Sequence, residues 1–368
     1  MARIREVTLH HPKLPLIKPY RLSYKVHHAY EPFIAEIRDE DGRVGWADAI
    51  VSTGYTTETP EGAWRFLEHH AEAIVGMKPE SAKGAVLDAS KGNANAATIL
   101  VAAIEMLEGS PILDVAEETR VPLLTPVSAV EPDQIREEVD RHVADGFPTL
   151  KIKVGFDVDD DLRRVAVIQE AAAGRATLRL DANRAYTREQ GRRFAAALDP
   201  TDIELFEQPC AMDDWEANAA VAEVSMVPVM LDESIYDLPD IDRAATIPGV
   251  GFVKLKLKKL VSCERLKAGL ERIRALGMEP VLGDGVGVEL NCWMEACVGR
   301  MTIRNAGEMN GFLKPKDRLL ANPLIFERGS ILLPAGYVPE MDMAALDAHL
   351  VRRRRFARTA AAVGPPPR

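Results

Sequence analysis

Apolar and polar positions follow two different patterns along the chain. In residues 1–57 they alternate at nearly every second position, which predicts short strands with a hairpin turn at residues 39–42: REVTLHH, YRLSY, PFIAEIRD and GRVGWADAI. Residues 58–118 carry the wider spacing typical of helices, in TPEGAWRFLEHHAEAIVG and in an Ala-rich run that ends with ATILVAAIEMLEG. Residues 1–120 are therefore expected to form an α+β domain.

From residue 121 onwards, eight short apolar runs alternate with amphipathic stretches. The runs are LLTPVSAV, TLKIKVG, ATLRLDAN, DIELFEQP, VPVMLDES, GFVKLKLKK, EPVLGDG and TIRNAGEMNG. Charged residues close seven of these runs at intervals of 24 to 28 residues: Lys153, Asp181, Glu207, Asp232, Lys256, Asp284 and Glu308. Strands that alternate with helices run parallel, so eight such units predict a (β/α)₈ barrel over residues 121–320. A doubly wound sheet would need a Gly-rich phosphate turn, and neither GxGxxG nor GxxxxGK[ST] occurs.

The last segment, residues 321–368, has a third sequence pattern. NPLIFERGSILLPAGYVPE predicts a short β ribbon that returns to the N-terminal domain. The Arg-rich and then Pro-rich tail that follows, RRRRFARTAAAVGPPPR, is expected to be a solvated, frayed end. A contact of this tail with a polyanion is the alternative.

Composition narrows the classes of function. The 368 residues include 56 acidic and 46 Lys or Arg side chains, a net charge of −10, which argues against a general nucleic-acid binder. No apolar stretch approaches the length of a membrane span, and the charged N-terminus resembles no signal peptide. The four cysteines lack CxxC spacing, so a reduced, cytoplasmic protein is expected.

Three carboxylates end consecutive predicted strands, in LRLD, LFE and VMLD: Asp181, Glu207 and Asp232. Three neighbouring barrel strands would direct them to one point, and hard oxygen ligands with open positions suit Mg²⁺. Zinc is disfavoured because no histidine occurs between His142 and His349. The alternative is that these side chains cap the helices that follow.

Lysines recur at every second position in two of the predicted strands: Lys151 and Lys153 in one, and Lys254, Lys256 and Lys258 in the other. Side chains at this spacing share one face. The residues between them are apolar and would face the covering helices, so the lysines should point into the barrel; an exposed edge strand is the alternative. A buried lysine near other cations has a lowered pKa and can act as a base.

These groups suggest chemistry at the carbon next to a carboxylate. Chelation by Mg²⁺ acidifies the α-proton of such a substrate, one lysine removes this proton, and the metal stabilises the enediolate. A lysine on the opposite side could return a proton to the other face, which is racemisation. It could instead only shield charge, as in elimination or lactone formation.

As a set, these motifs resemble the enolase superfamily, and within it the muconate lactonizing enzyme subgroup of the mandelate racemase/muconate lactonizing enzyme family. The matching segments are Lys151-Ile152-Lys153, Asp181-Ala182-Asn183, Glu207-Gln208-Pro209, Asp232-Glu233-Ser234 and the sixth-strand Lys256. The resemblance implies a capping domain completed by the C-terminal segment, a catalytic barrel and a homo-oligomer. It also implies that Lys153 and Lys256 are paired bases and that Asp181, Glu207 and Asp232 bind Mg²⁺. The missing barrel histidines argue against the mandelate racemase subgroup.

The sequence departs from the family pattern at two strand ends. Lys259-Leu260-Val261-Ser262 stands where the family has a Gly-Gly turn, so Lys256 is the expected sixth-strand lysine, with Lys254 and Lys258 as fallbacks. The eighth strand ends in Glu308-Met309-Asn310-Gly311, which looks more like the E-x-x-G of the lactonizing enzymes than the DxD of the epimerases.

Further substrate contacts are expected from the strand ends and from the early loops of the capping domain, at about residues 18–30 and 54–57. Asp284 is either a substrate contact or a helix cap. The full set of candidates is Asn183, Glu233, Asp284, Glu308, Asn310, Tyr55, His27 and His28.

The sequence thus predicts an Mg²⁺-dependent racemase or epimerase acting on a small carboxylate, such as an amino-acid derivative. A cycloisomerase or a dehydratase using the same chemistry is the alternative. A binding protein without catalysis on the same scaffold is a remote third possibility.

Overall fold

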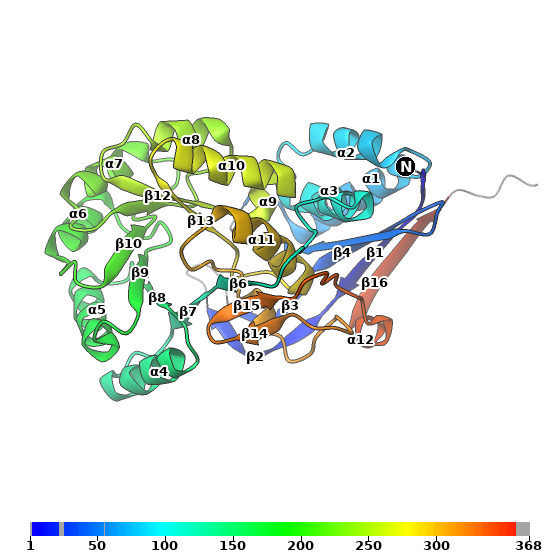
Figure 1. Cartoon of the computed structure of the whole chain (residues 1–368). Helices are drawn as coiled ribbons and strands as arrows, with labels where there is room; N and C mark the ends of the chain where they lie inside the picture. The colour runs from blue at the N-terminus through cyan, green and yellow to red at the C-terminus, as the bar shows by residue number, and fades with distance from the viewer. Residues whose placement is uncertain (1, 22–25, 55, 358–368) are drawn as a thin grey trace, which may run out of the picture.

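The computed structural model describes residues 2–21, 26–54 and 56–357. An antiparallel sheet in the order β16-β1-β4-β5 forms the N-terminal part (Figure 1). Its strands are β1 (Ile4–Pro12), β4 (Phe33–Asp39), β5 (Val44–Ala49) and β16 (Leu350–Ala357), with a separate hairpin of β2 (Leu14–Arg21) and β3 (Val26–Tyr30). Three helices pack beside the sheet: α1 (Pro60–Ile74), α2 (Pro79–Asp88) and α3 (Ala94–Glu108).

Local sequence explains how the first helix begins and packs. Thr59 is the N-cap of α1, and its side chain accepts a hydrogen bond from the Gly62 N–H, while Pro60 occupies the first turn. The apolar residues Ala63, Trp64, Leu67, Ala71 and Ile74 follow at helical spacing and are buried. The periodicity seen in the sequence is therefore the face that packs into the core of the N-terminal domain.

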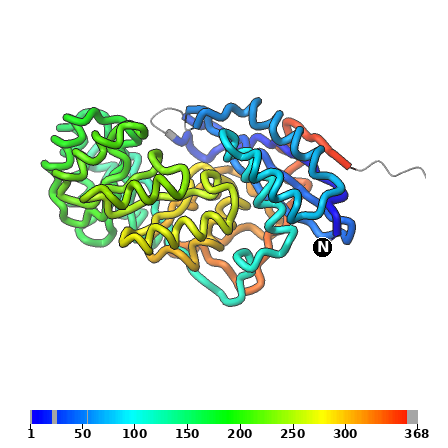
Figure 2. The backbone as a smooth tube through the Cα atoms, turned by 90° about the horizontal axis from the view of Figure 1, so that it is seen from above, coloured from blue at the N-terminus to red at the C-terminus, as the bar shows by residue number. Residues whose placement is uncertain are grey.

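Seven parallel strands follow in the order β13-β12-β11-β10-β9-β8-β7. They are β7 (Leu124–Val127), β8 (Thr149–Lys153), β9 (Thr177–Asp181), β10 (Ile203–Glu207), β11 (Val229–Leu231), β12 (Val250–Leu255) and β13 (Glu279–Leu282). The helices that follow these strands are α4 (Pro132–Ala144), α5 (Val158–Ala172), α6 (Arg188–Ala197), α7 (Trp215–Val224), α8 (Leu238–Ala244), α9 (Leu257–Leu260), α10 (Cys263–Ala275) and α11 (Glu289–Thr302). Figure 2 shows this part beside the N-terminal domain.

The eighth unit closes the barrel without a full strand. The Glu308 N–H donates to the Leu282 carbonyl of β13 at 2.9 Å, and the Leu124 N–H of β7 donates to the Gly307 carbonyl at 2.9 Å. Residues 307 and 308 thus bridge the two edges of the open sheet. The fold is the expected α/β barrel with an N-terminal capping domain, and the predicted eighth strand is reduced to this bridge.

The C-terminal segment first adds to the barrel and then returns to the capping domain. Strands β14 (Ile325–Glu327) and β15 (Ser330–Leu333) form a sheet with β6 (Thr119–Pro122). After the 3₁₀ helix Gly311–Leu313 and helix α12 (Met343–Ala348), β16 pairs antiparallel with β1. The expectation of a frayed Arg-rich tail is therefore wrong for Arg352–Arg355, which lie in β16 and form ion pairs with acidic side chains. Residues 358–368 lie outside the described residues.

Two buried carboxylates of the capping domain hold barrel helices. Asp48 of β5 accepts a hydrogen bond from the Asn291 N–H at the start of α11, at 3.0 Å. Glu105 of α3 accepts one from the Cys263 N–H at the start of α10, at 2.8 Å. Helix α11 has no side-chain cap of its own, so Asp48 supplies the missing acceptor across the two domains. None of the helices within the described ranges is long and apolar enough to cross a bilayer.

We expect Asp48→Asn to change how stability depends on pH. Burial raises the pKa of Asp48 from 3.8 to about 7. Between these values the folded protein keeps a proton that the unfolded chain has lost, so this group's contribution to stability falls as pH rises and levels off above about pH 7. The introduced amide would remain an acceptor for the helix but would not titrate. Denaturant unfolding between pH 4 and pH 8 measures this effect. As pH rises, the free energy of unfolding of the wild type should fall relative to that of the variant by up to about 1.4 kcal/mol per pH unit. If the free energy of unfolding depended on pH in the same way in both proteins, Asp48 would not have the raised pKa.

Candidate metal and active site

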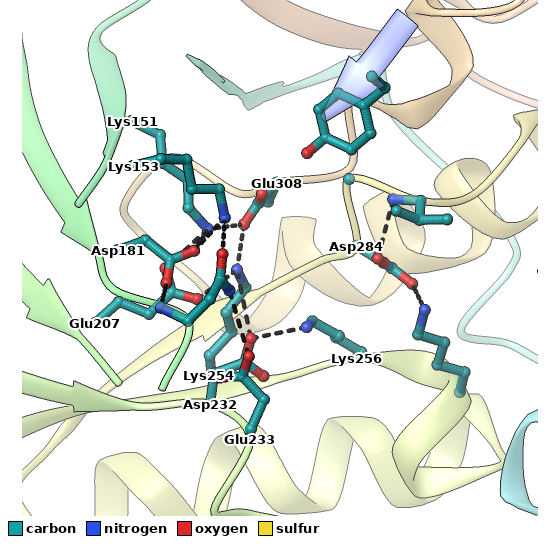
Figure 3. Close-up of a pocket in the computed structure, with 15 residues that line it drawn as sticks. Lys151, Lys153, Asp181, Glu207, Asp232, Glu233, Lys254, Lys256, Asp284 and Glu308 are labelled. Carbon is teal, nitrogen blue, oxygen red and sulfur yellow. Dashed lines mark hydrogen bonds and ion pairs between the residues drawn. The ribbon is translucent and has the colours of Figure 1, made fainter. Parts of the chain in front are cut away.

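A pocket lined mostly by charged side chains lies at the carboxyl ends of the barrel strands. It has a cavity volume of about 40 Å³ and is shown in Figure 3. Its lining consists mostly of lysines and carboxylates: Tyr20, Lys151, Lys153, Asp181, Asn183, Glu207, Asp232, Glu233, Lys254, Lys256, Lys258, Asp284, Gly285, Val286 and Glu308. The structure therefore brings all six of the expected metal-binding and catalytic residues to one place.

The three carboxylates expected to bind metal come from consecutive strands. Asp181 and Glu207 are the last residues of β9 and β10 and stand opposite each other in the sheet register. Asp232 follows β11 directly, and its N–H donates to Gln208 Oε1 at 3.0 Å. Gln208 also accepts from the Ser234 N–H, so this side chain ties the ends of β10 and β11 together.

Helix capping does not explain these carboxylates. The helices that follow the three strands are capped by other residues: α6 by Thr187, α7 by Asp214 and α8 by Asp237, each through its own side chain. Asp284 likewise does not cap α11, which begins after Val288. For Asp181, Glu207 and Asp232, the capping role is thus taken by residues further along the chain; at α11 the acceptor is Asp48 of the capping domain.

Lysines from β8 enter the pocket beside these carboxylates. Lys153 stands opposite Asp181 in the register, and its ammonium donates to Asp181 Oδ2 at 2.5 Å and to Asn183 Oδ1 at 2.6 Å. Lys151 lies deeper, within 2.9 Å of Asp181, Glu207 and Glu308 oxygens. The shared face predicted for these two lysines is the face that lines the pocket.

The sixth strand is shorter than the lysine pattern suggested. Strand β12 ends at Leu255, and the chain turns into the short helix α9 after Lys256. The prediction that Lys254, Lys256 and Lys258 share one face of a strand is therefore wrong for Lys258, which lies in α9, although all three line the pocket. The helix also brings Lys259 to Asp232 Oδ1 at 2.7 Å, on the same carboxylate that Lys256 contacts at 2.7 Å.

Ion pairing controls the charge state of these acids. Burial alone would raise the pKa of Asp181, but Lys151 and Lys153 hold it at about 2. Burial opposes ionisation of Asp232 in the same way, and Lys256 and Lys259 bring its pKa well below the ordinary value. Burial and the neighbouring Asp181 instead raise the pKa of Glu207. Asp181 and Glu207 are neighbouring carboxylates that repel each other when both are ionised. A cation beside them would stabilise the ionised form of both.

The chemistry of the donors fits Mg²⁺. Asp181, Glu207 and Asp232 are buried oxygen donors, and the pocket lining contains no histidine or cysteine. Within the part of the chain that the structure describes, no group of three Asp, Glu, His or Cys side chains is arranged so that it could hold a metal ion. Their oxygens meet lysine ammonium groups instead, so a divalent ion would have to take the place of some of these contacts.

The remaining expected substrate contacts divide into two groups. Asn183, Glu233, Asp284 and Glu308 line the pocket. Asn183 links Lys153 to Glu233, since its Nδ2 donates to Glu233 Oε1 at 3.3 Å. Asp284 forms an ion pair with Lys258 and accepts from the Val286 N–H at 3.0 Å.

The other candidates are not brought to this pocket. Asn310 donates to the Leu124 carbonyl and accepts from Lys314, so it connects the barrel ends. His27 is buried beside Ser52, and His28 is exposed; both line a second cavity of about 230 Å³ on the capping domain. Tyr55 lies outside the described residues.

Two pocket-side residues were not among the individual residues predicted from the sequence, although Tyr20 lies in the segment 18–30 that was expected to contact the substrate. Tyr20 of β2 reaches into the pocket from the capping domain, and Lys314 lies 4.3 Å from the centre of its ring. The Lys314 ammonium donates to the Gly285 carbonyl at 2.6 Å, and burial lowers its pKa to about 8. Neither residue belongs to a motif; the sequence pointed only to the segment that contains Tyr20, and the structure identifies the residue itself and Lys314 beside it.

Comparison with known proteins places this geometry in a family. The family model described as "Enolase C-terminal domain-like" matches residues 134–337, more than half of the chain. The chain is 29% identical over 266 residues to a hydrophobic dipeptide epimerase of Enterococcus faecalis, covering 70% of this chain and 75% of the relative. It is 28% identical over 330 residues to an o-succinylbenzoate synthase of Geobacillus kaustophilus, covering 85% and 84%.

Solved structures show the same fold. A dipeptide epimerase from Cytophaga hutchinsonii, complexed with Mg and the dipeptide D-Ala-L-Val, superposes with a TM-score of 0.87 at 21% identity and covers 96% of this chain and 100% of its own. A muconate lactonizing enzyme from Pseudomonas fluorescens, complexed with muconolactone, also gives 0.87, at 20% identity, covering 95% and 100%. On the family match, the chain belongs to the Enolase C-terminal domain-like family.

Proposed function

We propose that the protein removes the α-proton of a small carboxylate in an Mg²⁺-dependent reaction, as a racemase or epimerase. The strand order carries this proposal. Lysine-bearing β8 and β12 flank the three carboxylate-bearing strands β9, β10 and β11, so Lys153 and Lys256 reach the same pocket from opposite sides. Two bases on either side of a substrate are what inversion at a carbon atom requires.

The side chains around Lys153 suit a proton acceptor. As a neutral amine, Lys153 keeps two N–H bonds, and Asp181 and Asn183 are placed to accept both. The lone pair of the nitrogen then occupies the third position and takes the α-proton of the substrate, which leaves Lys153 as an ammonium group. Lys256, held by Asp232, serves the opposite face.

Asp181, Glu207 and Asp232 would hold the metal. When bound there, Mg²⁺ supplies a chelating centre for the substrate carboxylate and offsets the negative charge that develops as the α-proton leaves. Tyr20 adds an aromatic side chain from the capping domain to the pocket lining. The named relatives that are epimerases and racemases support an amino-acid derivative or a dipeptide as the substrate.

A cycloisomerase is the second candidate, and one observation favours it. Glu308, the eighth-strand carboxylate, pairs with both Lys151 and Lys254, so its single negative charge is already balanced and would attract a substrate ammonium group only weakly. A substrate without such a group would suit this arrangement. A chloromuconate cycloisomerase of Cupriavidus pinatubonensis is also among the relatives, at 25% identity.

Hydrogen exchange at the α-carbon tests the proposal. In D₂O with Mg²⁺, we expect the true substrate among dipeptides, N-acyl amino acids and muconate-type acids to lose its α-proton signal by NMR and to gain the opposite configuration. A product with changed connectivity would instead identify the cycloisomerase. Absence of both exchange and product with every acid tested, in a protein that binds Mg²⁺, would refute the proposal.

We also propose that the protein works in the cytoplasm as a homo-oligomer. The four cysteines, Cys210, Cys263, Cys292 and Cys297, are buried and unbridged, as expected in a reducing compartment. Light scattering of the purified protein measures the number of subunits.

A further inference from the structure

Lys254 is a buried cation that the proposed reaction does not use. It lies on β12, is 2% exposed, and lines the pocket among the carboxylates (Figure 3). Its ammonium lies 3.1 Å from Glu207 Oε1 and 3.9 Å from Asp232 Oδ2, and it forms an ion pair with Glu308. Lys254 therefore touches or approaches two of the three carboxylates expected to bind metal.

The site already contains enough positive charge to balance its acids. Six carboxylates line the pocket: Asp181, Glu207, Asp232, Glu233, Asp284 and Glu308. Six lysines form ion pairs with acids of this set: Lys151, Lys153, Lys254, Lys256, Lys258 and Lys259. A divalent ion would add two positive charges to a buried cluster that has no surplus of negative charge, which is electrostatically costly.

Glu308 provides Lys254 with a second anion. This carboxylate comes from the bridge that closes the barrel, and it contacts Lys254 and Lys151 without belonging to the predicted metal ligands. Lys254 can therefore leave Glu207 and Asp232 and stay paired with Glu308, so the exchange leaves no buried charge alone.

We propose that Lys254 is a positioning residue that competes with the divalent cation for Glu207 and Asp232. It keeps the site ion-paired before loading and makes metal binding weak until the negative charge of a substrate carboxylate is added. This inference rests on the proposed function, because it concerns the same metal site. It goes further in assigning to the chain itself the control of metal affinity.

Binding of Mn²⁺ as a probe for Mg²⁺, measured by calorimetry and by electron paramagnetic resonance, tests this role. Lys254→Met keeps the length and removes the charge, so Mn²⁺ should bind roughly tenfold or more tightly than to the wild type. Lys258→Met is the matched control, because Lys258 lines the same pocket but pairs with Asp284, and its change should be much smaller. Glu308→Gln should act in the opposite direction and weaken binding.

Thermal unfolding gives a second readout that does not depend on activity. Without divalent ions, Lys254→Met leaves Glu207 and Glu308 short of a cation and should lower Tm; added Mg²⁺ should raise its Tm more than that of the wild type. If Lys254→Met does not fold, Lys254→Gln and Glu308→Gln carry the same comparison.

The outcomes separate this inference from the proposed function. Unchanged or weaker Mn²⁺ binding in the Lys254 variants, with the wild type binding normally, overturns the competition. Tightening in Lys258→Met equal to that in Lys254→Met also overturns it, because the effect would then be general to the charge of the pocket. If neither the wild type nor the Lys254 variants bind a divalent ion, the proposed metal-dependent function fails as well.

Discussion

Lys153→Ala is expected to reduce turnover by roughly 10²- to 10⁴-fold, the usual contribution of a positioned acid or base. Lys153 is the lysine whose ammonium is oriented by both Asp181 and Asn183, and it lines the pocket. Removing it should abolish proton exchange on one face of the substrate. Stereospecific loss of the α-proton in D₂O, followed for each enantiomer separately, measures this.

Lys256→Ala is the matched variant, because Lys256 reaches the pocket from the other side. It should abolish exchange from the opposite enantiomer and leave the first intact. If Lys153→Ala turns over the true substrate as fast as the wild type, Lys153 is not the base. Equal loss of exchange from both enantiomers in both variants would argue against two separate faces.

Glu207→Gln is expected to weaken Mg²⁺ binding by roughly 100-fold or more, since even changes in residues that only support metal ligands cost 10- to 100-fold. Glu207 ends β10, the central one of the three carboxylate strands, and its neighbours Asp181 and Asp232 stand on either side. The substitution keeps the shape and removes one negative charge. Calorimetric titration with Mg²⁺ measures the change.

Glu204→Gln is the control on the same strand. Glu204 pairs with Arg179 at 2.8 Å and is not among the residues of the pocket lining, so its substitution should leave Mg²⁺ affinity unchanged. Circular dichroism of both variants would show whether the barrel is intact. Mg²⁺ binding that survives in Glu207→Gln and in the corresponding Asp181 and Asp232 variants would refute the metal site.

Regular strand and helix periods made most of the fold predictable. In β8, Lys151 and Lys153 alternate with Leu150 and Ile152, and this two-residue period is enough to assign the lysines to the interior face. The barrel interior is filled by alternate residues of each strand, so a local pattern places them. The carboxylates at the strand ends could be predicted for the same reason.

The predictions from sequence were wrong where contacts between distant parts of the chain changed the local structure that the residue pattern indicated. The lysine alternation continues past Leu255, but Glu295 of α11 accepts a hydrogen bond from the Leu257 N–H and the chain turns into α9. The Arg-rich tail looks solvated by itself, yet β1 offers it an edge with which to pair. His27 and His28 lie on a hairpin whose direction depends on packing against the rest of the capping domain.

The sequence by itself determined the barrel, an N-terminal α+β domain and the residue types at each strand end, because these follow from local apolar periods and from a spacing of about 25 residues between strand ends. The capping role of the N-terminal domain came from the resemblance to a family. Only the tertiary structure decided which lysine meets which carboxylate. Those pairings depend on how β12 ends, on where the bridge at Glu308 closes the ring, and on distances across the barrel between residues up to 157 positions apart. Lys254, expected only as a substitute base, instead forms ion pairs with Glu207 and Glu308 and lies 3.9 Å from Asp232.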